Sequence, residues 1–302
     1  MNSNINQGFI ILLIRITAID YVRLLRPINV FMVASMALAG IWFGNQNSPW
    51  FIYFLGVIVA ISYTGIAMIH NDILDIEIDK INAPHRALPS GRVTKQEALI
   101  YMIILFVIGT ICGLFLTPES ILIMGLTLVL SLSYNARLKK MGFIGNLAVG
   151  ITATSAFLYG DAAANGWNNF WPFFNWTASI YLFTISAFLN TSREVCKGIM
   201  DTEGDAKYGV QTIAVLYGKK VASVFVLVLV GFALGMTIIP IVNGTFRWVF
   251  YIGLAAFVVL ILMIGIPLLK NPNYETAKRF KNWLHPMMLL MLILIVVDKV
   301  LL

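Results

Sequence analysis

The stretch HNDILDIEID, His70 to Asp79, follows a long apolar run and places an asparagine and four acidic side chains close together. A charged side chain inside the lipid core costs roughly 2.5–3.5 kcal/mol on insertion scales, so acidic residues at the end of an apolar helix need a binding partner. The stretch therefore predicts a membrane-spanning helix with a site at its end that binds a positively charged group.

The composition predicts an integral membrane protein. The chain has 302 residues, of which 59% are hydrophobic and 12% are charged, against roughly 25% charged residues in ordinary soluble domains. Because no polar linker or low-complexity segment interrupts the chain, we expect an all-α polytopic bundle that forms a single domain over residues 25–302. The net charge of +7 is explained by basic loops beside a membrane, so no nucleic-acid partner is expected, and the sequence leaves the oligomeric state open.

The hydropathy pattern predicts nine transmembrane helices. A bilayer core of about 30 Å needs about 20 apolar residues per helix, and turn residues such as NQNSP at 45–49 separate the apolar runs. Residues 1–24 are expected to form an interfacial segment and no secretory signal, because Arg15 interrupts a short apolar run. The expected spans are 27–45, 50–70, 97–116, 120–136, 143–162, 171–192, 220–242, 248–269 and 283–302.

The basic residues predict how these spans are oriented. With nine spans, all of the 21 Lys and Arg residues except Arg247 and Lys299 fall on one side of the membrane. Cytoplasmic loops are enriched in Lys and Arg, so we expect a cytoplasmic N-terminus in a multi-pass protein of the cell membrane. The acidic stretch then lies at the cytoplasmic end of the second span.

Three side chains of the opening stretch repeat with helical spacing. Asn71, Asp75 and Asp79 stand at i, i+4 and i+8, which places them on one face of a helix, with Asp72 beside that face and Glu77 pointing elsewhere. Oxygen ligands without His or Cys suit Mg²⁺, which binds through one or two carboxylates, waters and substrate phosphates. The alternative is a solvated helix end that is merely acidic.

A second oxygen-rich segment lies in the other half of the chain. In NTSREVCKGIMDTEGD, the residues Asn190, Glu194, Asp201 and Asp205 follow one helical face at the end of the sixth span. Two acidic clusters on the same side of the membrane would repel each other unless cations lie between them. The pair predicts two Mg²⁺ ions that hold a diphosphate.

The remaining basic residues, cysteines and histidines are interpreted from their positions in the sequence. Arg86, Lys139 and Lys197 lie beside the acidic segments, where they would neutralise charge on a departing diphosphate. The two cysteines and three histidines lack metal-ligand or redox spacing. Other basic residues are interpreted as ordinary positive-inside residues, namely Arg92, Lys95, Lys219, Lys220 and the group at 278–281.

These motifs resemble those of the UbiA family of intramembrane prenyltransferases. The resemblance rests on NDILDIEID, on DTEGD, on the loop ending LPSG and on RPIN at Arg26 to Asn29, and it covers residues 20–302. It implies Mg²⁺-dependent transfer of a polyprenyl group from its diphosphate to a lipophilic acceptor, through diphosphate loss and an allylic carbocation, within a lipid bilayer. The wording REVCKGIMDTEGD is most similar to an archaeal branch, which implies geranylgeranyl diphosphate as donor and geranylgeranylglyceryl phosphate as acceptor.

The resemblance also implies roles for individual residues. Tyr134 matches a tyrosine that lies near the reacting carbon in family members. The metal ligands would be Asn71, Asp75, Asp79, Asp201 and Asp205; the catalytic residues Asp75, Asp201, Tyr134 and Lys139; and the diphosphate- or substrate-binding residues Arg26, Asn29, Asp72, Arg86, Asn135, Lys139, Asn190, Arg193 and Lys197.

One departure and several alternatives accompany this interpretation. Ala83 stands where an arginine is common in the family, and Ala87 stands where a proline is common, so Arg86 would carry more of the phosphate binding. CDP-alcohol phosphotransferases are excluded because their motif begins with Asp-Gly and continues with Ala-Arg, whereas Asp75 is followed by Ile76 and Glu77. Soluble prenyl synthases carry their aspartates on amphipathic helices, whereas the spans of this chain are apolar all round. An aromatic acceptor of the 4-hydroxybenzoate type stays open, and so does a cation transporter, although transporter carboxylates lie nearer the midplane.

Overall fold

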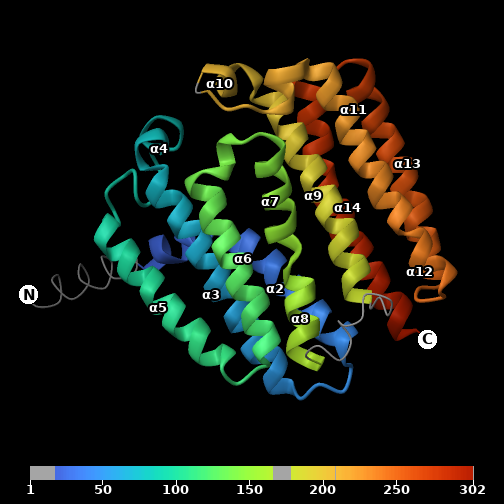
Figure 1. Cartoon of the computed structure of the whole chain (residues 1–302), viewed down its shortest axis with the longest axis horizontal. Coiled ribbons are helices and arrows are strands. Elements are labelled where there is room, and N and C mark those ends of the chain that lie inside the picture. The colour runs from blue at the N-terminus through green and yellow to red at the C-terminus, as the bar shows by residue number, and fades with distance from the viewer. Residues whose placement is uncertain (1–17, 166–177, 208, 302) are drawn as a thin grey trace, which may run out of the picture.

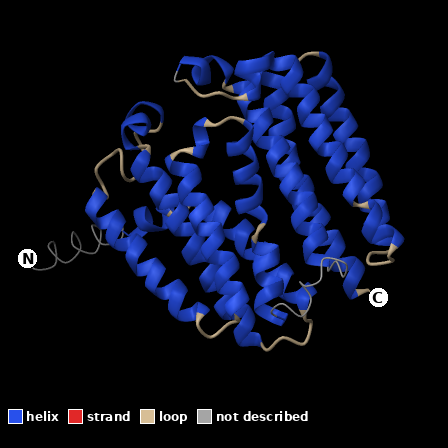
Figure 2. Cartoon of the chain, in the orientation of Figure 1, coloured by secondary structure: helices blue, strands red, loops and turns tan. Residues whose placement is uncertain are grey.

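The computed structural model describes residues 18–165, 178–207 and 209–301, and these residues form a bundle of helices without any strand (Figures 1 and 2). Of the expected interfacial segment 1–24, only residues 18–24 belong to the described part, where they are helical. The all-α class expected from the sequence is confirmed.

Eight helical segments of the described chain are long and apolar enough to cross a membrane. This agrees with the expectation of a polytopic membrane bundle, because each of the eight overlaps one expected span. The ends agree to within four residues, except that two segments begin earlier than expected, at Ile213 instead of 220 and at Tyr274 instead of 283. The helices in these segments are α2 (Pro27–Gly44), α3 (Trp50–Leu74), α5 (Lys95–Gly113), α6 (Pro118–Ala136), α7 (Phe143–Thr154) with α8 (Ala156–Asn165), α11 (Ile213–Met236) with α12 (Ile238–Val242), α13 (Trp248–Lys270) and α14 (Tyr274–Val300).

The remaining expected span, 171–192, corresponds to α9 (Ala178–Met200), and its first residues lie outside the described part. The second half of α9 carries Asn190, Arg193, Glu194 and Lys197, and α9 is not among the eight segments that are apolar enough to cross a membrane by composition alone. The helix tolerates these residues because it lies inside the bundle, where α7, α11 and α14 pack around it (Figure 1).

Two expected spans are interrupted. The span expected at 143–162 breaks at Ser155 between α7 and α8, where the hydroxyl of Ser155 donates to the carbonyl of Thr152 at 3.0 Å and receives a bond from Thr127 at 3.0 Å. The span expected at 220–242 breaks at Thr237 between α11 and α12, and α11 also has a kink before that span begins, at Gly218 with φ 85°. Hydropathy does not register the breaks at Ser155 and Thr237, because apolar residues continue on both sides of each of them.

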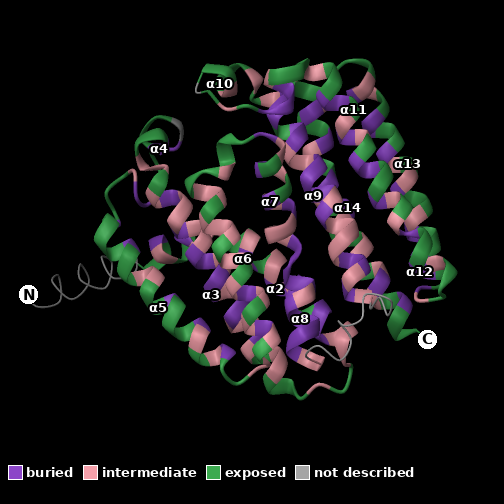
Figure 3. Ribbon diagram, viewed as in Figure 1, coloured by how far each residue is buried: buried purple, intermediate pink, exposed green. Residues whose placement is uncertain are grey.

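The outward surface of the bundle is apolar, as a lipid-facing surface requires. Figure 3 shows that buried residues gather between the helices while exposed ones follow their outer faces. On α5, the exposed side chains include Ile100, Ile103, Ile104 and Ile111, and on α13 they include Leu262 and Met263.

Small residues allow a close approach of two helices, α2 and α8. A Cβ atom on Gly40 would overlap the carbonyl of Phe157, and one on Gly160 would overlap the carbonyl of Ala37. Small residues at such crossings are the usual device by which membrane helices pack without a hydrophobic driving force. This contact brings α2 against the middle of the bundle, where it forms part of the site described below.

The two oxygen-rich segments lie at the same end of the bundle, as the sequence predicts. The short helices α4 (Ile76–Asn82) and α10 (Thr202–Lys207) both lie toward the upper edge of Figure 1. Each segment is interrupted at its aspartate, because Asp75 separates α3 from α4 and Asp201 separates α9 from α10. We call this edge the polar end of the bundle.

A buried aspartate organises the opposite end. Asp298 of α14 is 1% exposed, and its carboxylate accepts hydrogen bonds from the backbone amides of Arg247 at 2.6 Å, Val249 at 2.9 Å and Phe250 at 3.3 Å. These amides start α13, whose own preceding residue offers no side-chain cap. A negative charge there also favours the positive end of the helix dipole.

We expect Asp298→Ala to destabilise the protein by about 3 kcal/mol, because buried backbone amides lose a charged acceptor. Asp298→Asn retains one oxygen acceptor and is expected to cost less. The measurement is the thermal unfolding midpoint in detergent, with the exposed neighbour Lys299→Ala as control. Equal midpoints for Asp298→Ala and Lys299→Ala would contradict this role.

Candidate active site

A cavity of about 540 Å³ opens at the polar end and continues between α2, α3, α6, α7, α9 and α14. Its mouth is lined by charged and amide side chains, and its depth by apolar ones such as Met32, Met36, Met124 and Leu128. Of the residues assigned from the sequence, twelve line it: Arg26, Asn29, Asn71, Asp75, Asp79, Arg86, Tyr134, Asn135, Lys139, Asn190, Arg193 and Lys197.

The first acidic segment contributes Asn71, Asp75 and Asp79 to the cavity wall. The sequence predicts one continuous helix through these three residues, but the helix α3 ends at Asp75, which has φ −94° and ψ 6°. The i, i+4, i+8 relation nevertheless survives, since the amide of Asp75 bonds the carbonyl of Asn71 at 3.0 Å and the amide of Asp79 bonds that of Asp75 at 2.7 Å. The break therefore tilts the segment without turning its ligands away.

Each carboxylate of this segment that faces the cavity has a cationic partner. The ammonium of Lys139 donates to both oxygens of Asp75, at 2.9 and 2.6 Å, and Arg86 donates to Asp79 at 2.6 Å. Such charge-assisted pairs hold both partners in defined positions. A ligand that binds here must therefore exchange partners with these ion pairs.

Asp72 does not line the cavity but supports it from behind. It is 4% exposed, forms an ion pair with Arg26 and lies 3.8 Å from Arg86. Arg26 itself has φ 51°, an uncommon value for a residue other than glycine. The expected substrate-binding role of Asp72 is thus indirect in this geometry, because the carboxylate positions two arginines that reach the cavity.

The loop after α4 is fixed by a second buried aspartate. Arg92 donates to Asp20, which is 1% exposed, at 2.8 Å, and to the carbonyl of His85 at 2.7 Å. Arg92, interpreted from the sequence as an ordinary positive-inside residue, therefore ties the loop that carries Arg86 to the N-terminal helix.

The amide side chains stabilise the walls. Asn135 donates to the carbonyl of Ala67 at 2.9 Å and so joins α6 to α3. Asn29 donates to the sulfur of Met68 at 3.5 Å and joins α2 to α3. Tyr134 lines the cavity beside Asn135, at the end of the fourth expected span.

The second segment is divided between the cavity and its rim. Asn190, Arg193, Glu194 and Lys197 line the cavity from α9. The expected continuous face ends at Met200, so Asp201 and Asp205 fall on the bend and short helix that follow. The structure does not bring these two aspartates to the cavity wall.

The two rim aspartates influence each other. Partial burial, together with the nearby charge of Asp201, raises the pKa of Asp205 to about 6, although Lys197 opposes the shift. Two carboxylates close enough to repel are stabilised by a cation between them.

The loop that follows α10 is held in place, since the amide of Gln211 donates to the carbonyl of Lys140 at 3.3 Å.

The donor set fits a hard cation that is completed by its substrate. Among the described residues, no group of three or more His, Cys, Asp or Glu side chains forms a preformed cage for a metal. Mg²⁺ does not require one, because it commonly binds through one or two carboxylates and substrate phosphates. The oxygens of Asn71, Asp75 and Asp79 supply such ligands.

Among the acidic, basic and histidine side chains that line the cavity, three received no metal-binding, catalytic or substrate-binding role from the sequence: Glu194, Lys281 and His285. Lys281 was interpreted as an ordinary positive-inside residue and His285 as an ordinary helix-end residue. The expected span began at 283, whereas α14 begins at Tyr274, so the two residues lie on one helix. Their i, i+4 spacing is the signal that would have joined them.

Comparisons with known proteins extend over nearly the whole chain. The model of the UbiA prenyltransferase family matches residues 33–293. The digeranylgeranylglyceryl phosphate synthase of Sulfolobus acidocaldarius is 33% identical over 266 residues, which cover 87% of this chain and 91% of the relative. The enzyme of the same name from Methanobrevibacter smithii is 30% identical over 282 residues, covering 89% of this chain and 94% of the relative.

Solved structures share the fold. A structure of digeranylgeranylglyceryl phosphate synthase superposes with a TM-score of 0.80 at 29% identity and covers 95% of this chain and 99% of that one. A UbiA homolog from Archaeoglobus fulgidus bound to DMAPP and Mg²⁺ superposes with a TM-score of 0.62 at 17% identity, covering 92% and 99%.

The paired acidic segments at one end of an apolar helical bundle, the extent of the family match and the identity to these relatives lead to one conclusion. The chain belongs to the UbiA prenyltransferase family and is an intramembrane prenyltransferase.

Proposed function

We propose that this chain transfers the geranylgeranyl group of geranylgeranyl diphosphate to geranylgeranylglyceryl phosphate, a step of archaeal ether-lipid synthesis. The observation that carries the proposal is a cavity whose mouth holds paired carboxylates and cations and whose depth is apolar. The relatives named digeranylgeranylglyceryl phosphate synthase support the choice of substrates. The polar mouth suits the charged diphosphate of such a donor, and the apolar depth suits its isoprenoid chain.

The donor diphosphate is assigned to the polar end. Asn71, Asp75 and Asp79 on one segment, with Asp201 and Asp205 on the other, are the proposed ligands of two Mg²⁺ ions. When bound, Mg²⁺ would neutralise the diphosphate and make it a better leaving group. The homolog whose structure contains DMAPP and Mg²⁺ has the same fold, which supports a divalent metal in this family.

The leaving group also meets cationic side chains of this chain. Arg86, Lys139 and Lys197 line the cavity mouth and are placed to take up the negative charge that grows as the bond between carbon and the diphosphate oxygen breaks. Lys139 and Arg86 now bind Asp75 and Asp79. Because each cation already lies beside a proposed metal ligand, Lys139 and Arg86 need to move little to bind a diphosphate held by these ligands.

The departure of diphosphate leaves an allylic carbocation at the donor's first carbon. The acceptor hydroxyl oxygen then forms the new ether bond and releases its proton. Tyr134 offers the face of an aromatic ring to the cation, and the apolar walls of the cavity exclude water that would otherwise trap it. Arg26, Asn29, Asp72, Asn135 and Asn190 hold these walls and the cations in position.

The polar end is proposed to face the cytoplasm. It carries the segments with most of the basic residues, including Arg86, Lys139 and Lys197, while Arg247 and Lys299 belong to the other end. This arrangement follows the positive-inside rule. A water-soluble metal ion and the released diphosphate would then exchange with the cytoplasm.

The decisive test follows diphosphate release from geranylgeranyl diphosphate by purified protein in nanodiscs. We expect release with geranylgeranylglyceryl phosphate, at least tenfold slower release with 4-hydroxybenzoate, and none after EDTA treatment. Release only with the aromatic acceptor would preserve the mechanism and overturn the acceptor. Release with neither acceptor would overturn the proposed function.

Substitutions in the first acidic segment test the metal ligands. We expect Asp75→Ala to lower kcat at least 1000-fold without rescue by Mg²⁺, because it removes a central ligand. Raised Mg²⁺ is expected to restore part of the activity of Asp79→Asn, which retains one oxygen at the outer position. Steady-state rates over a Mg²⁺ series give both results.

Glu77→Gln is the matched control, since Glu77 belongs to the same segment but is 80% exposed in its side chain and pairs with Lys80. Its rate is expected to equal that of the unaltered protein. If Asp75→Ala responds to Mg²⁺ as Asp79→Asn does, the ranking of the two ligands is wrong.

A further inference from the structure

The cavity has two walls that differ in charge. The first, which we call the donor wall, carries Asp75 and Asp79, with Asp72 buried directly behind it. Each of these carboxylates is paired with a cation, since Arg26 binds Asp72, Lys139 binds Asp75 and Arg86 binds Asp79. The donor wall is therefore close to neutral when no metal or substrate is present.

The second wall, which we call the acceptor wall, is formed by α9 and α14. Arg193 and Lys197 share a single carboxylate, that of Glu194, at 2.8 and 3.9 Å. The side chain of Lys281 forms no ion pair with any described residue, and it is half-buried at the cavity. The acceptor wall thus has more positive than negative charge.

One detail indicates that Arg193 lacks a partner, and a second shows how His285 is held at the cavity. The Nε atom of Arg193 is buried without a hydrogen-bond partner among the described residues. The Nε2 atom of His285 lies 3.4 Å from the amide oxygen of Asn190, so α9 and α14 hold the imidazole at the cavity. A buried polar nitrogen without a partner is costly, and an anion between the helices would supply one.

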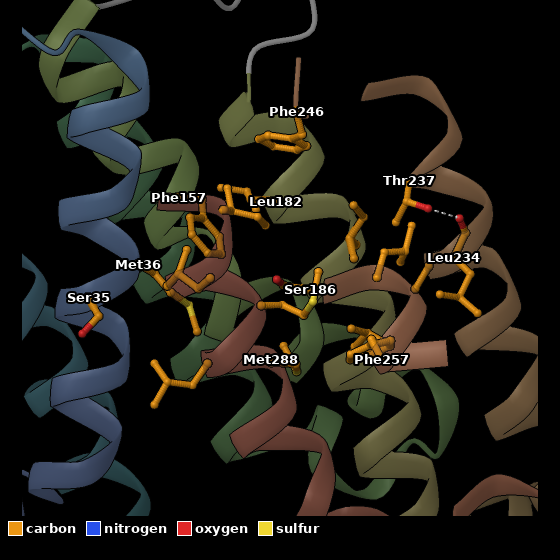
Figure 4. A pocket seen from close by; sticks show the side chains of 18 of the residues that line it. Ser35, Met36, Phe157, Leu182, Ser186, Leu234, Thr237, Phe246, Phe257 and Met288 are labelled. Atoms are coloured by element: carbon orange, nitrogen blue, oxygen red, sulfur yellow. Dashed lines mark hydrogen bonds between the residues drawn. The ribbon is translucent and has the colours of Figure 1, made fainter. Parts of the chain in front are cut away.

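The same two helices become apolar immediately below. A second cavity is lined by Ile185, Ser186 and Leu189 of α9 and by Met288, Met291 and Leu292 of α14. Figure 4 shows Met36, Phe157 and Phe257 gathered around it with Met288 and Leu182. From His285 to Met288 is about one helical turn, or about 5 Å along the axis.

The two cavities adjoin each other at α2. Met32 and Met36 line both of them. A molecule with an anionic head and an isoprenoid tail would therefore place its head at the acceptor wall and its tail in the apolar cavity.

Resting on the function proposed above, we propose that Arg193, Lys281 and His285 bind the phosphate of the acceptor lipid, whose chain follows α9 and α14 into the apolar cavity. The guanidinium fork and the ammonium suit a phosphate monoester. The acceptor hydroxyl, which belongs to the same glyceryl head, then lies in the cavity between this wall and the donor wall. The same cations would also attract the donor diphosphate, so the test separates these two sources of phosphate.

The test compares two acceptors, geranylgeranylglyceryl phosphate and geranylgeranylglycerol, which lacks the phosphate. For the unaltered protein we expect kcat/KM to be at least 100-fold higher with the phosphorylated acceptor. In Lys281→Gln and in His285→Ala this ratio is expected to fall at least tenfold, with the loss in the acceptor KM and the KM of geranylgeranyl diphosphate changed less than twofold. Lys281→Arg is expected to restore the ratio.

Lys278→Gln is the matched control, because it removes the same charge from an exposed position one turn earlier in α14, where Lys278 lies over the ring of Tyr274. Its ratio is expected to equal that of the unaltered protein. An unchanged ratio in Lys281→Gln and His285→Ala would overturn the phosphate site, and so would a loss confined to the donor KM. If the unaltered protein uses neither glyceryl acceptor, the proposed function fails instead.

Discussion

Charge pairing at the mouth of an apolar bundle is the constraint on which this structure depends. A single charge in the lipid core costs roughly 2.5–3.5 kcal/mol, and two opposite unit charges 4 Å apart near a protein surface gain about 4 kcal/mol. The two energies are of the same order, so a cationic partner can offset the cost of a carboxylate at the mouth of the bundle. The pairs of Asp75 with Lys139 and of Asp79 with Arg86 satisfy this condition and draw α3, α4, the following loop and η1 (Leu138–Lys140) to one place.

The backbone is arranged to serve these pairs. Both acidic segments end a long helix at an aspartate and continue as a short one, α4 after Asp75 and α10 after Asp201. The break allows the segment to leave the helix axis while the i to i+4 backbone bonds continue across it. Behind it, Asp72 and Asp20 anchor Arg26 and Arg92 from nearly buried positions, so the cavity mouth is supported by ion pairs that the substrate need not touch.

The sequence predicted the spans well because hydropathy depends on composition, which each helix carries within itself. It failed where neighbouring elements decide the outcome. Hydropathy placed the start of the last span at 283, since Lys281 and Lys278 look like loop residues, whereas α14 continues to Tyr274 because its N-terminus is capped by Asn273. Asp201 and Asp205 lie beyond the end of α9 at Met200, and although the i to i+4 backbone bonds continue across this break, neither aspartate lines the cavity. The spacing of Asn71, Asp75 and Asp79 was informative because its periodicity survives the break and all three residues line the cavity.

The uneven charge of the two walls has a consequence for how the cavity fills. The donor wall is close to neutral by itself, so it attracts a diphosphate only after cations have joined its carboxylates. The acceptor wall is positive without any added ion, since Glu194 is the one carboxylate among the cavity-lining residues of α9 and α14, against Arg193, Lys197 and Lys281. A diphosphate carries more negative charge than a phosphate monoester, and the wall that can add divalent cations is the one that suits it. The positions of the carboxylates and of the cations thus determine which wall binds the donor diphosphate and which binds the acceptor phosphate.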